Sequence, residues 1–152
     1  MRDICIIIKI KTVMKQHISI LLLLFLINSI DAQTETQNII VNISNFDNNE
    51  GKVMVALYDS GSSFLKTSKK GMIGIIKSNT SIVTFKDVPK GIYAISIFHD
   101  ENDNGKLETN FLGIPKEDTG TSNNAPARFG PPKWEDAKFE IKNKTITLNI
   151  KL

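Results

Sequence analysis

The residues best suited to chemistry lie in one short polar stretch, residues 100–108. Short oxygen-bearing side chains alternate there in the pattern D-x-N-x-N-G, which ends at Gly105. A calcium ion takes about six to eight oxygen ligands, and alternate Asp and Asn side chains on a tight turn supply several of them. The predicted metal ligands are Asp100, Asn102, Asn104, the carbonyl of Lys106 and Glu108.

The same stretch departs from an EF-hand calcium loop at its last position. The twelfth residue is Phe111, where an EF-hand has a bidentate glutamate, and no helix is expected to follow. The missing carboxylate would have to come from Asp103, Glu117 or Asp118. Two interpretations remain open, a weak calcium site and an Asx-rich turn that needs no ion. The sequence favours the turn.

His99, directly before this stretch, is the only histidine beyond residue 17. Together with Asp100 and either Glu108 or Glu117 it would supply the groups of a metal-assisted hydrolase. Consecutive strand residues point to opposite faces, however, so His99 and Asp100 are not expected to meet. The sequence has no G-x-S-x-G nucleophile motif, and no cysteine follows residue 5. A histidine buried in the core or bonded to a loop is therefore favoured, and the sequence leans away from an enzyme.

A candidate site for a ligand, rather than an ion, lies in residues 110–134. This segment combines aromatic rings, amides and one arginine with prolines that stiffen the backbone. Such a mixture suits a sugar or peptide surface, where rings stack and amides form hydrogen bonds. The candidate ligand-binding residues are Asn123, Asn124, Arg128, Phe129 and Trp134. The favoured alternative is a loop folded over the open end of the fold, with its rings as plugs.

The elements that must position these residues are β-strands, because apolar residues recur with a period of two. In residues 145–152, for example, Ile146, Leu148 and Ile150 face one way while Thr147 and Asn149 face the other. Strands are predicted at residues 39–44, 52–58, 72–77, 81–85, 92–99, 137–141 and 145–152. They predict an all-β fold, an antiparallel β-sandwich of about seven strands of the immunoglobulin-like or transthyretin-like kind. A small barrel is the alternative.

The connections between these strands also carry information. The turn residues at 47–51 predict a hairpin between the first two strands. Residues 52–58 form a nearly continuous apolar run, which predicts a central strand covered on both faces. One long irregular loop is expected at residues 100–133, followed by a helical turn at Trp134. Loops of this length tend to be functional or disordered.

The start of the chain has the pattern of a secretory signal peptide. Lys15 precedes an apolar run at residues 18–27, and Ala32 is a small residue before a polar stretch. The run is shorter than a membrane span of about 20 residues. We expect a signal peptide at residues 1–32, with the true start at Met14, and a single β-sandwich domain at residues 33–152. The protein is then periplasmic or extracellular, with no membrane span after cleavage.

The composition excludes several classes of protein. The chain has 152 residues, of which 41% are hydrophobic and 23% charged, and its single cysteine allows no intramolecular disulfide. Four of the 19 Lys and Arg residues and two of the 16 Asp and Glu residues precede residue 33, so the predicted domain has a net charge of +1. Its lysines are scattered and form no basic stripe, so nucleic acid is not expected as a partner.

Four stretches, taken in order, are similar to one known family. They are VALY at residues 55–58, GIYAISIFHDENDNG at 91–105, NFLGIPKE at 110–117 and SNNAPARFGPP at 122–132. Together they resemble the bacterial family called domain of unknown function 2141, over roughly residues 39–152. The resemblance implies a secreted or periplasmic single-domain protein and no particular activity. It also favours one shared surface for residues 100–108 and 122–132.

The sequence thus predicts an exported binding or structural module of the cell envelope. Its expected partner is a glycan, a peptide or an envelope protein, and in the calcium interpretation its loop is stabilised by the ion. The alternative is a metal-assisted hydrolase that uses His99 and Asp100.

Overall fold

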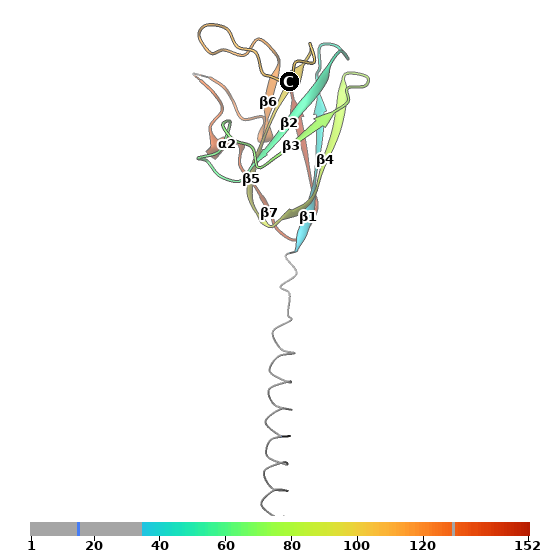
Figure 1. Ribbon diagram of the computed structural model, residues 1–152, viewed down its shortest axis with the longest axis vertical. Helices are drawn as coiled ribbons and strands as arrows, with labels where there is room; N and C mark the ends of the chain where they lie inside the picture. Colours follow the sequence, from blue (N-terminus) through green and yellow to red (C-terminus); the bar gives the residue numbers. More distant parts are fainter. Residues whose placement is uncertain (1–14, 16–34, 129) are drawn as a thin grey trace, which may run out of the picture. The chain divides into compact units, whose positions relative to one another are not determined.

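The computed structural model describes Lys15 and residues 35–152 apart from Phe129, and it shows two β-sheets (Figure 1). The chain divides after Thr34, and its second unit, Glu35–Leu152, holds the strands described below. The predicted signal peptide, residues 1–32, lies outside the described residues except for Lys15.

The smaller sheet has three strands in the order β4-β1-β8. Its strands are β1 (Thr36–Ser44), β4 (Thr80–Pro89) and β8 (Ile146–Lys151). β1 pairs antiparallel with β4 and parallel with β8. Both edges of β1 are therefore occupied within this sheet.

The larger sheet follows the order β3-β2-β5-β6, and a further short strand, β7, pairs with the start of β5. Its strands are β2 (Lys52–Tyr58), β3 (Lys70–Gly74), β5 (Gly91–Asp100), β6 (Thr119–Thr121) and β7 (Phe139–Ile141). All pairings in this sheet are antiparallel. The predicted all-β sandwich is confirmed, with eight strands in the described chain and one parallel pair.

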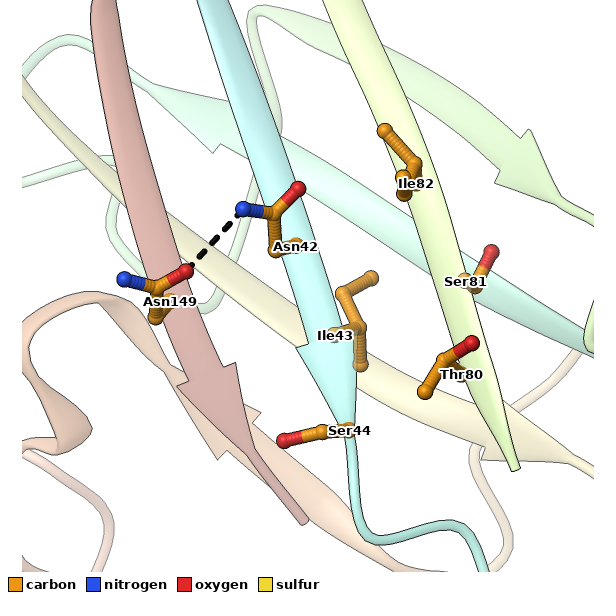
Figure 2. Close-up of a pocket in the computed structure, with 7 residues that line it drawn as sticks. All are labelled: Asn42, Ile43, Ser44, Thr80, Ser81, Ile82 and Asn149. Atoms are coloured by element: carbon orange, nitrogen blue, oxygen red, sulfur yellow. Dashed lines mark hydrogen bonds between the residues drawn. The ribbon is translucent and has the colours of Figure 1, made fainter. Parts of the chain in front are cut away.

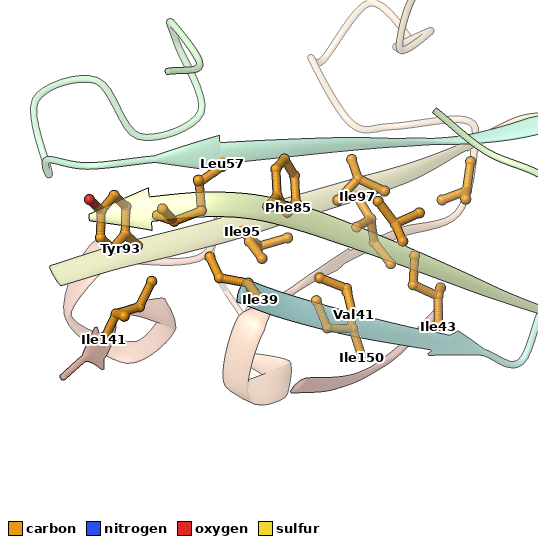
Figure 3. Close-up of a cluster of buried hydrophobic side chains, with 14 of the residues drawn as sticks. Ile39, Val41, Ile43, Leu57, Phe85, Tyr93, Ile95, Ile97, Ile141 and Ile150 are labelled. Carbon is orange, nitrogen blue, oxygen red and sulfur yellow. The ribbon is translucent and has the colours of Figure 1, made fainter. Parts of the chain in front are cut away.

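The core lies between the two sheets and is built by the alternation of side chains along the strands (Figure 3). β1 contributes Ile39, Val41 and Ile43, while Ile95 and Ile97 come from β5. β2 is central in its sheet, as predicted, because β3 and β5 flank it. The core thus covers one face of the larger sheet and leaves its outer face for other contacts.

The predicted hairpin between the first two strands is wrong. β1 already pairs with β4 and β8, so β2 joins the other sheet and residues 45–51 cross between the sheets. This crossing is tied to the turn before β4, because the backbone N–H of Asn79 donates to Asn49 Oδ1 at 2.8 Å. Phe46, which is buried, closes the core at this end.

The long irregular loop predicted at residues 100–133 is interrupted by structure. It contains β6 and the short 3-10 helix η2 (Ser122–Asn124), and α2 (Trp134–Ala137) follows as the predicted helical turn. The sequence Thr-Gly-Thr of β6 has no apolar pattern, so its strand was not predicted. The third strand also differs from its predicted range of 72–77, because it ends at Gly74 and Lys77 instead bridges to Thr80.

Gly74 is a position of close contact between β3 and β4. A Cβ atom there would lie 2.5 Å from Ser81 Oγ and 2.7 Å from a methyl carbon of Val83. Gly71 lies in the same strand, but a Cβ atom on Gly71 would have no described atom within 4 Å apart from its chain neighbours. We expect Gly74→Ala to lower the free energy of unfolding by about 1–3 kcal/mol. Gly71→Ala should change it by less than about 0.5 kcal/mol. Urea denaturation measures both, and equal effects would contradict this packing.

Candidate functional site

A groove of about 1210 Å³ lies on the outer face of the larger sheet, and we call it the sheet groove. Its floor comes from side chains of β2 and β5 that point away from the core, namely Met54, Ala56, Tyr58, Ser96 and Phe98. Its two walls come from the long connection after β5, at residues 107–115 and 124–132. In Figure 1 both parts of this connection, orange and red, lie on the same side of the sheet.

Strand pairing arranges the floor in two cross-strand rows. Gly71, Ala56, Ser96 and Thr121 lie opposite one another across β3, β2, β5 and β6, and we call them the small-residue row. The adjacent row on the same face consists of Ile73, Met54, Phe98 and Thr119. Because the first row carries little side-chain volume and the second carries more, the small-residue row forms a trough.

The sheet groove exposes apolar side chains to solvent. Ile73 is 58% exposed, Leu112 is 68% exposed and Ile114 is 55% exposed. The floor also has one polar pair, because Tyr58 Oη and Ser96 Oγ share a hydrogen bond of 3.1 Å. Contiguous exposed apolar surface of this kind is typical of a binding site.

The first wall starts from a buried carboxylate. Asp100 is 0% exposed, and it accepts hydrogen bonds from the backbone N–H groups of Asn104 at 3.0 Å and Gly105 at 2.8 Å. Lys52 Nζ lies 3.8 Å from Asp100 Oδ2 and 3.0 Å from Asp103 Oδ1. The hydrogen bond to Asp103 raises the pKa of Lys52, and the charges of Asp103 and Asp100 add to this effect. A charged ammonium group therefore stands beside the buried carboxylate.

Three of the five predicted calcium ligands, Asp100, Asn102 and Asn104, lie together in this turn, and their side-chain oxygens accept hydrogen bonds from the backbone. Glu108 instead pairs with the returning segment, because its carbonyl accepts the N–H of Lys116. Asn102 Oδ1 accepts the N–H of Asn104 at 3.1 Å, and Asn104 Oδ1 accepts the N–H of Lys106 at 2.7 Å. No group of three or more His, Cys, Asp or Glu side chains placed to hold a metal ion occurs in the described part of the chain. The geometry is that of an Asx-rich turn beside a lysine, and calcium binding stays a prediction.

The rest of the first wall is stiffened by its own hydrogen bonds. Glu108 donates its backbone N–H to Glu117 Oε2 at 3.1 Å. Asn110 Oδ1 accepts the N–H groups of Leu112 at 2.9 Å and Ile114 at 3.1 Å. These bonds hold the apolar side chains of Leu112 and Ile114 at the edge of the sheet groove.

The second wall starts from a buried serine. Ser122 is 0% exposed, and its Oγ accepts the N–H of Ile95 at 2.9 Å and donates to the carbonyl of Ala137 at 2.6 Å. One hydroxyl group thus joins η2, β5 and α2. The two residues that follow, Asn123 and Asn124, have positive φ angles of 59° and 48°, a conformation that asparagine tolerates.

The side chains of these two asparagines fix the direction of the second wall. Asn123 Nδ2 donates to the carbonyl groups of Asp136 at 3.1 Å and Lys138 at 2.9 Å. Asn124 Oδ1 accepts the N–H of Lys151 at 2.9 Å. The wall is therefore bonded both to the segment around α2 and to the end of β8.

The candidate ligand-binding residues divide into two groups. Asn124 and Arg128 line the sheet groove. Asn123 and Trp134 instead support the wall, since the Trp134 ring packs edge-on against Phe64 with centroids 5.8 Å apart. Phe129 lies outside the described residues.

His99 and Asp100 point to opposite faces of β5, and neither lines the sheet groove. His99 is 0% exposed, and its Nε2 lies 2.8 Å from the carbonyl oxygen of Glu50. Its ring packs at a right angle on Phe46, with centroids 5.1 Å apart. This is the arrangement of a buried histidine bonded to a loop.

A second depression, of about 380 Å³, lies on the smaller sheet (Figure 2). Asn42 Nδ2 donates there to Asn149 Oδ1 at 3.0 Å, as the dashed line in Figure 2 shows. None of the described residues that line it is charged. Because the two amides already bond to each other, this depression offers a ligand less than the sheet groove does.

Sequence reasoning missed the floor of the sheet groove. Met54, Ala56 and Phe98 belong to predicted strands, and their outward direction follows from alternation. The apolar run at residues 52–58 predicted a strand covered on both faces, but not that its outer face forms the floor of a groove.

Comparison with known proteins gives one match. The model of the family "Uncharacterized protein conserved in bacteria (DUF2141)" matches residues 41–149, which run from β1 to β8 and include both walls. No curated protein and no solved structure matches the chain. Within the described residues, none of the helices has the length and apolar character of a transmembrane segment.

Proposed function

The chain belongs to the uncharacterized bacterial family DUF2141, and we propose that it is an exported binding module that holds an apolar ligand in the sheet groove. The observation that carries this proposal is the groove of about 1210 Å³ with a mostly apolar lining and hydrogen-bonded walls. Ligand sites commonly have volumes of about 300–1,000 Å³, apolar linings and a few placed polar groups. An open groove slightly above this range fits a small or elongated ligand.

The lining favours an apolar ligand over a glycan. Sugars are recognised by exposed ring faces and unpaired polar groups. On the floor, Tyr58 and Ser96 bond to each other, while Met54, Phe98 and Ile73 offer apolar surface. A peptide or envelope protein would have to present apolar side chains to the same surface.

Export is the second part of the proposal, and its support is the leader pattern. Lys15, the apolar run at residues 18–27 and Ala32 have the order of a secretory signal peptide. An exported protein that begins at Gln33, as determined by mass spectrometry, would agree with cleavage after Ala32. An uncleaved chain would contradict it.

The hydrolase alternative has weaker support from the geometry. It needs His99 and Asp100 to act on one substrate, but both side chains are buried and they point to opposite faces of β5. A hydrolase would therefore have to open the core around Phe46 before its histidine met a substrate. The binding function needs no such opening.

Binding of N-phenyl-1-naphthylamine, a neutral dye that fluoresces in apolar surroundings, tests the proposed function. We expect saturable binding by the purified protein. Ala56→Phe should weaken it at least tenfold, because the new ring fills the trough of the small-residue row. Gly71→Leu serves as a second blocking variant, since a Cβ at Gly71 meets no described atom within 4 Å beyond its chain neighbours.

The matched control is Ile82→Phe, which adds a ring on the outer face of the smaller sheet. Ile82 is exposed there and does not line the sheet groove. Dye binding by this variant should equal that of the unmodified protein, and thermal unfolding checks that each variant is folded. Absence of dye binding, or equal binding by the blocking and control variants, would overturn the proposed function.

A further inference from the structure

We infer that the ligand of the sheet groove is a single-chain amphiphile with an acyl tail and an anionic head. This inference rests on the proposed function and adds the chemistry and direction of the ligand. The tail would lie in the trough of the small-residue row, and the head would meet Arg128 and Lys151.

The charge of the lining has one sign. Among the described residues that line the sheet groove, Arg128 and Lys151 are the charged ones, and no Asp or Glu is among them. The salt bridges found in the described part of the chain involve neither residue. Two cations without a carboxylate partner in an apolar surface are complementary to an anionic group.

The surroundings of the two cations, rather than the lack of a salt bridge, distinguish them from the other lysines. Lys52, Lys69 and Lys90 each pair with a carboxylate, as do Lys138 and Lys142, but the other described lysines form no salt bridge. Arg128 and Lys151 differ from these in belonging to a mostly apolar groove lining that contains no described carboxylate. Arg128 adds geometry to charge, because a guanidinium group can donate two parallel hydrogen bonds to a carboxylate or a phosphate.

The trough has a polar end and an apolar end. The small-residue row runs from Gly71 on β3 to Thr121 on β6, across three strand spacings, or about 14 Å. The backbone of Lys151 lies at the β6 end, since a Cβ on Gly120 would lie 2.9 Å from the Lys151 carbonyl oxygen and Asn124 Oδ1 accepts the Lys151 N–H. At the other end the lining is mostly apolar, with Leu65 and Ile73 near Gly71 and Ser68 as the polar residue.

An elongated amphiphile satisfies both ends at once. Its tail needs no hydrogen-bond partners, which fits a floor where Tyr58 and Ser96 bond to each other at 3.1 Å. Its head needs cationic donors, which Arg128 and Lys151 supply. A neutral hydrocarbon would leave these cations unused, and a cationic amphiphile would be repelled.

Displacement of bound N-phenyl-1-naphthylamine by compounds with ten-carbon tails, below their micelle concentrations, tests this inference. The probes are decanoate and decyl phosphate as anions, decanol as the neutral compound and decyltrimethylammonium as the cation. We expect the better anion to displace the dye at about tenfold lower concentration than decanol, with the cation weakest. The two anions distinguish a carboxylate from a phosphate head. Extending the tail by one methylene should strengthen binding about fourfold until the trough is full.

The charge variant is Arg128→Gln combined with Lys151→Gln, and its matched control is Lys142→Gln combined with Lys144→Gln. The dye affinity of each variant is measured first, and displacement by the anions is compared with displacement by decanol in the same variant. The charge variant should lose the preference for anions over decanol, while the control should keep it. In the unmodified protein, saturable dye binding with equal displacement by decanoate, decyl phosphate and decanol would overturn the anionic head and leave the proposed function intact. Loss of all dye binding in the unmodified protein would instead overturn both.

Discussion

Replacement of Asp100 by alanine should lower the free energy of unfolding by about 3 kcal/mol and the melting temperature by roughly 10 °C. The carboxylate is fully buried and accepts the backbone N–H groups of Asn104 and Gly105 at 3.0 and 2.8 Å. Hydrogen bonds to a charged group are worth about 1.5–3 kcal/mol each. The substitution removes both bonds and the buried partner of Lys52, 3.8 Å away. Urea denaturation gives the free energy directly.

Asp103→Ala is the matched control for this substitution. Asp103 contacts the same Lys52 at 3.0 Å, but its side chain is 62% exposed. Exposed ion pairs contribute about 0–1 kcal/mol, so this variant should lose little stability. Comparable losses in the two variants would mean that the charge on Lys52, rather than the backbone bonds of Asp100, stabilises the turn.

The same variants separate the turn from the calcium interpretation. In the turn, Lys52 supplies the positive charge, so the melting temperature of the unmodified protein should be equal in EDTA and in calcium. A calcium site would instead add RT ln(1 + [L]/Kd), about 1.4 kcal/mol at ten times Kd. A saturable rise in melting temperature that Asp100→Ala abolishes would establish the ion and contradict our interpretation of the turn.

The strands could be predicted from the sequence, but their partners could not. Alternation in residues 39–44 and 145–152 marks two strands, and the structure contains both as β1 and β8. The turn residues at 47–51 have the same chemistry in a hairpin and in a crossing between sheets. β8, which comes from the other end of the domain, occupies the edge of β1 that a hairpin would need. This competition between distant segments leaves no local signal.

Prediction of the candidate site from the sequence has a similar limit. Asp100 and Asn102 were identified by side chains suited to binding a cation, yet such side chains accept backbone N–H groups equally well. Which of the two occurs depends on Lys52, whose approach to Asp100 follows from the pairing of β2 with β5. The groove floor was missed for a similar reason, because Met54 and Phe98 look like core residues until the sheet faces are assigned.

The two walls of the sheet groove have separate anchors, and both are fully buried. Asp100 holds the turn that starts residues 107–115, whereas Ser122 fixes the start of residues 124–132. The two anchors share no hydrogen-bond partner. Their effects on stability should therefore add, as expected for independent sites.

Ser122→Ala should lower the free energy of unfolding by about 2–4 kcal/mol, because it leaves two buried backbone groups without partners. The Ser122 hydroxyl accepts the N–H of Ile95 at 2.9 Å and donates to the carbonyl of Ala137 at 2.6 Å.

Ser81→Ala is the matched control, since Ser81 is also buried but its Oγ has no hydrogen-bond partner among the described residues. Ser81→Ala should change the free energy by less than about 0.5 kcal/mol. Equal losses in the two variants, measured by urea denaturation, would show that serine burial rather than these bonds sets the cost. A loss confined to Ser122→Ala, together with weaker dye binding, would show that one hydroxyl group holds the second wall in place for the ligand.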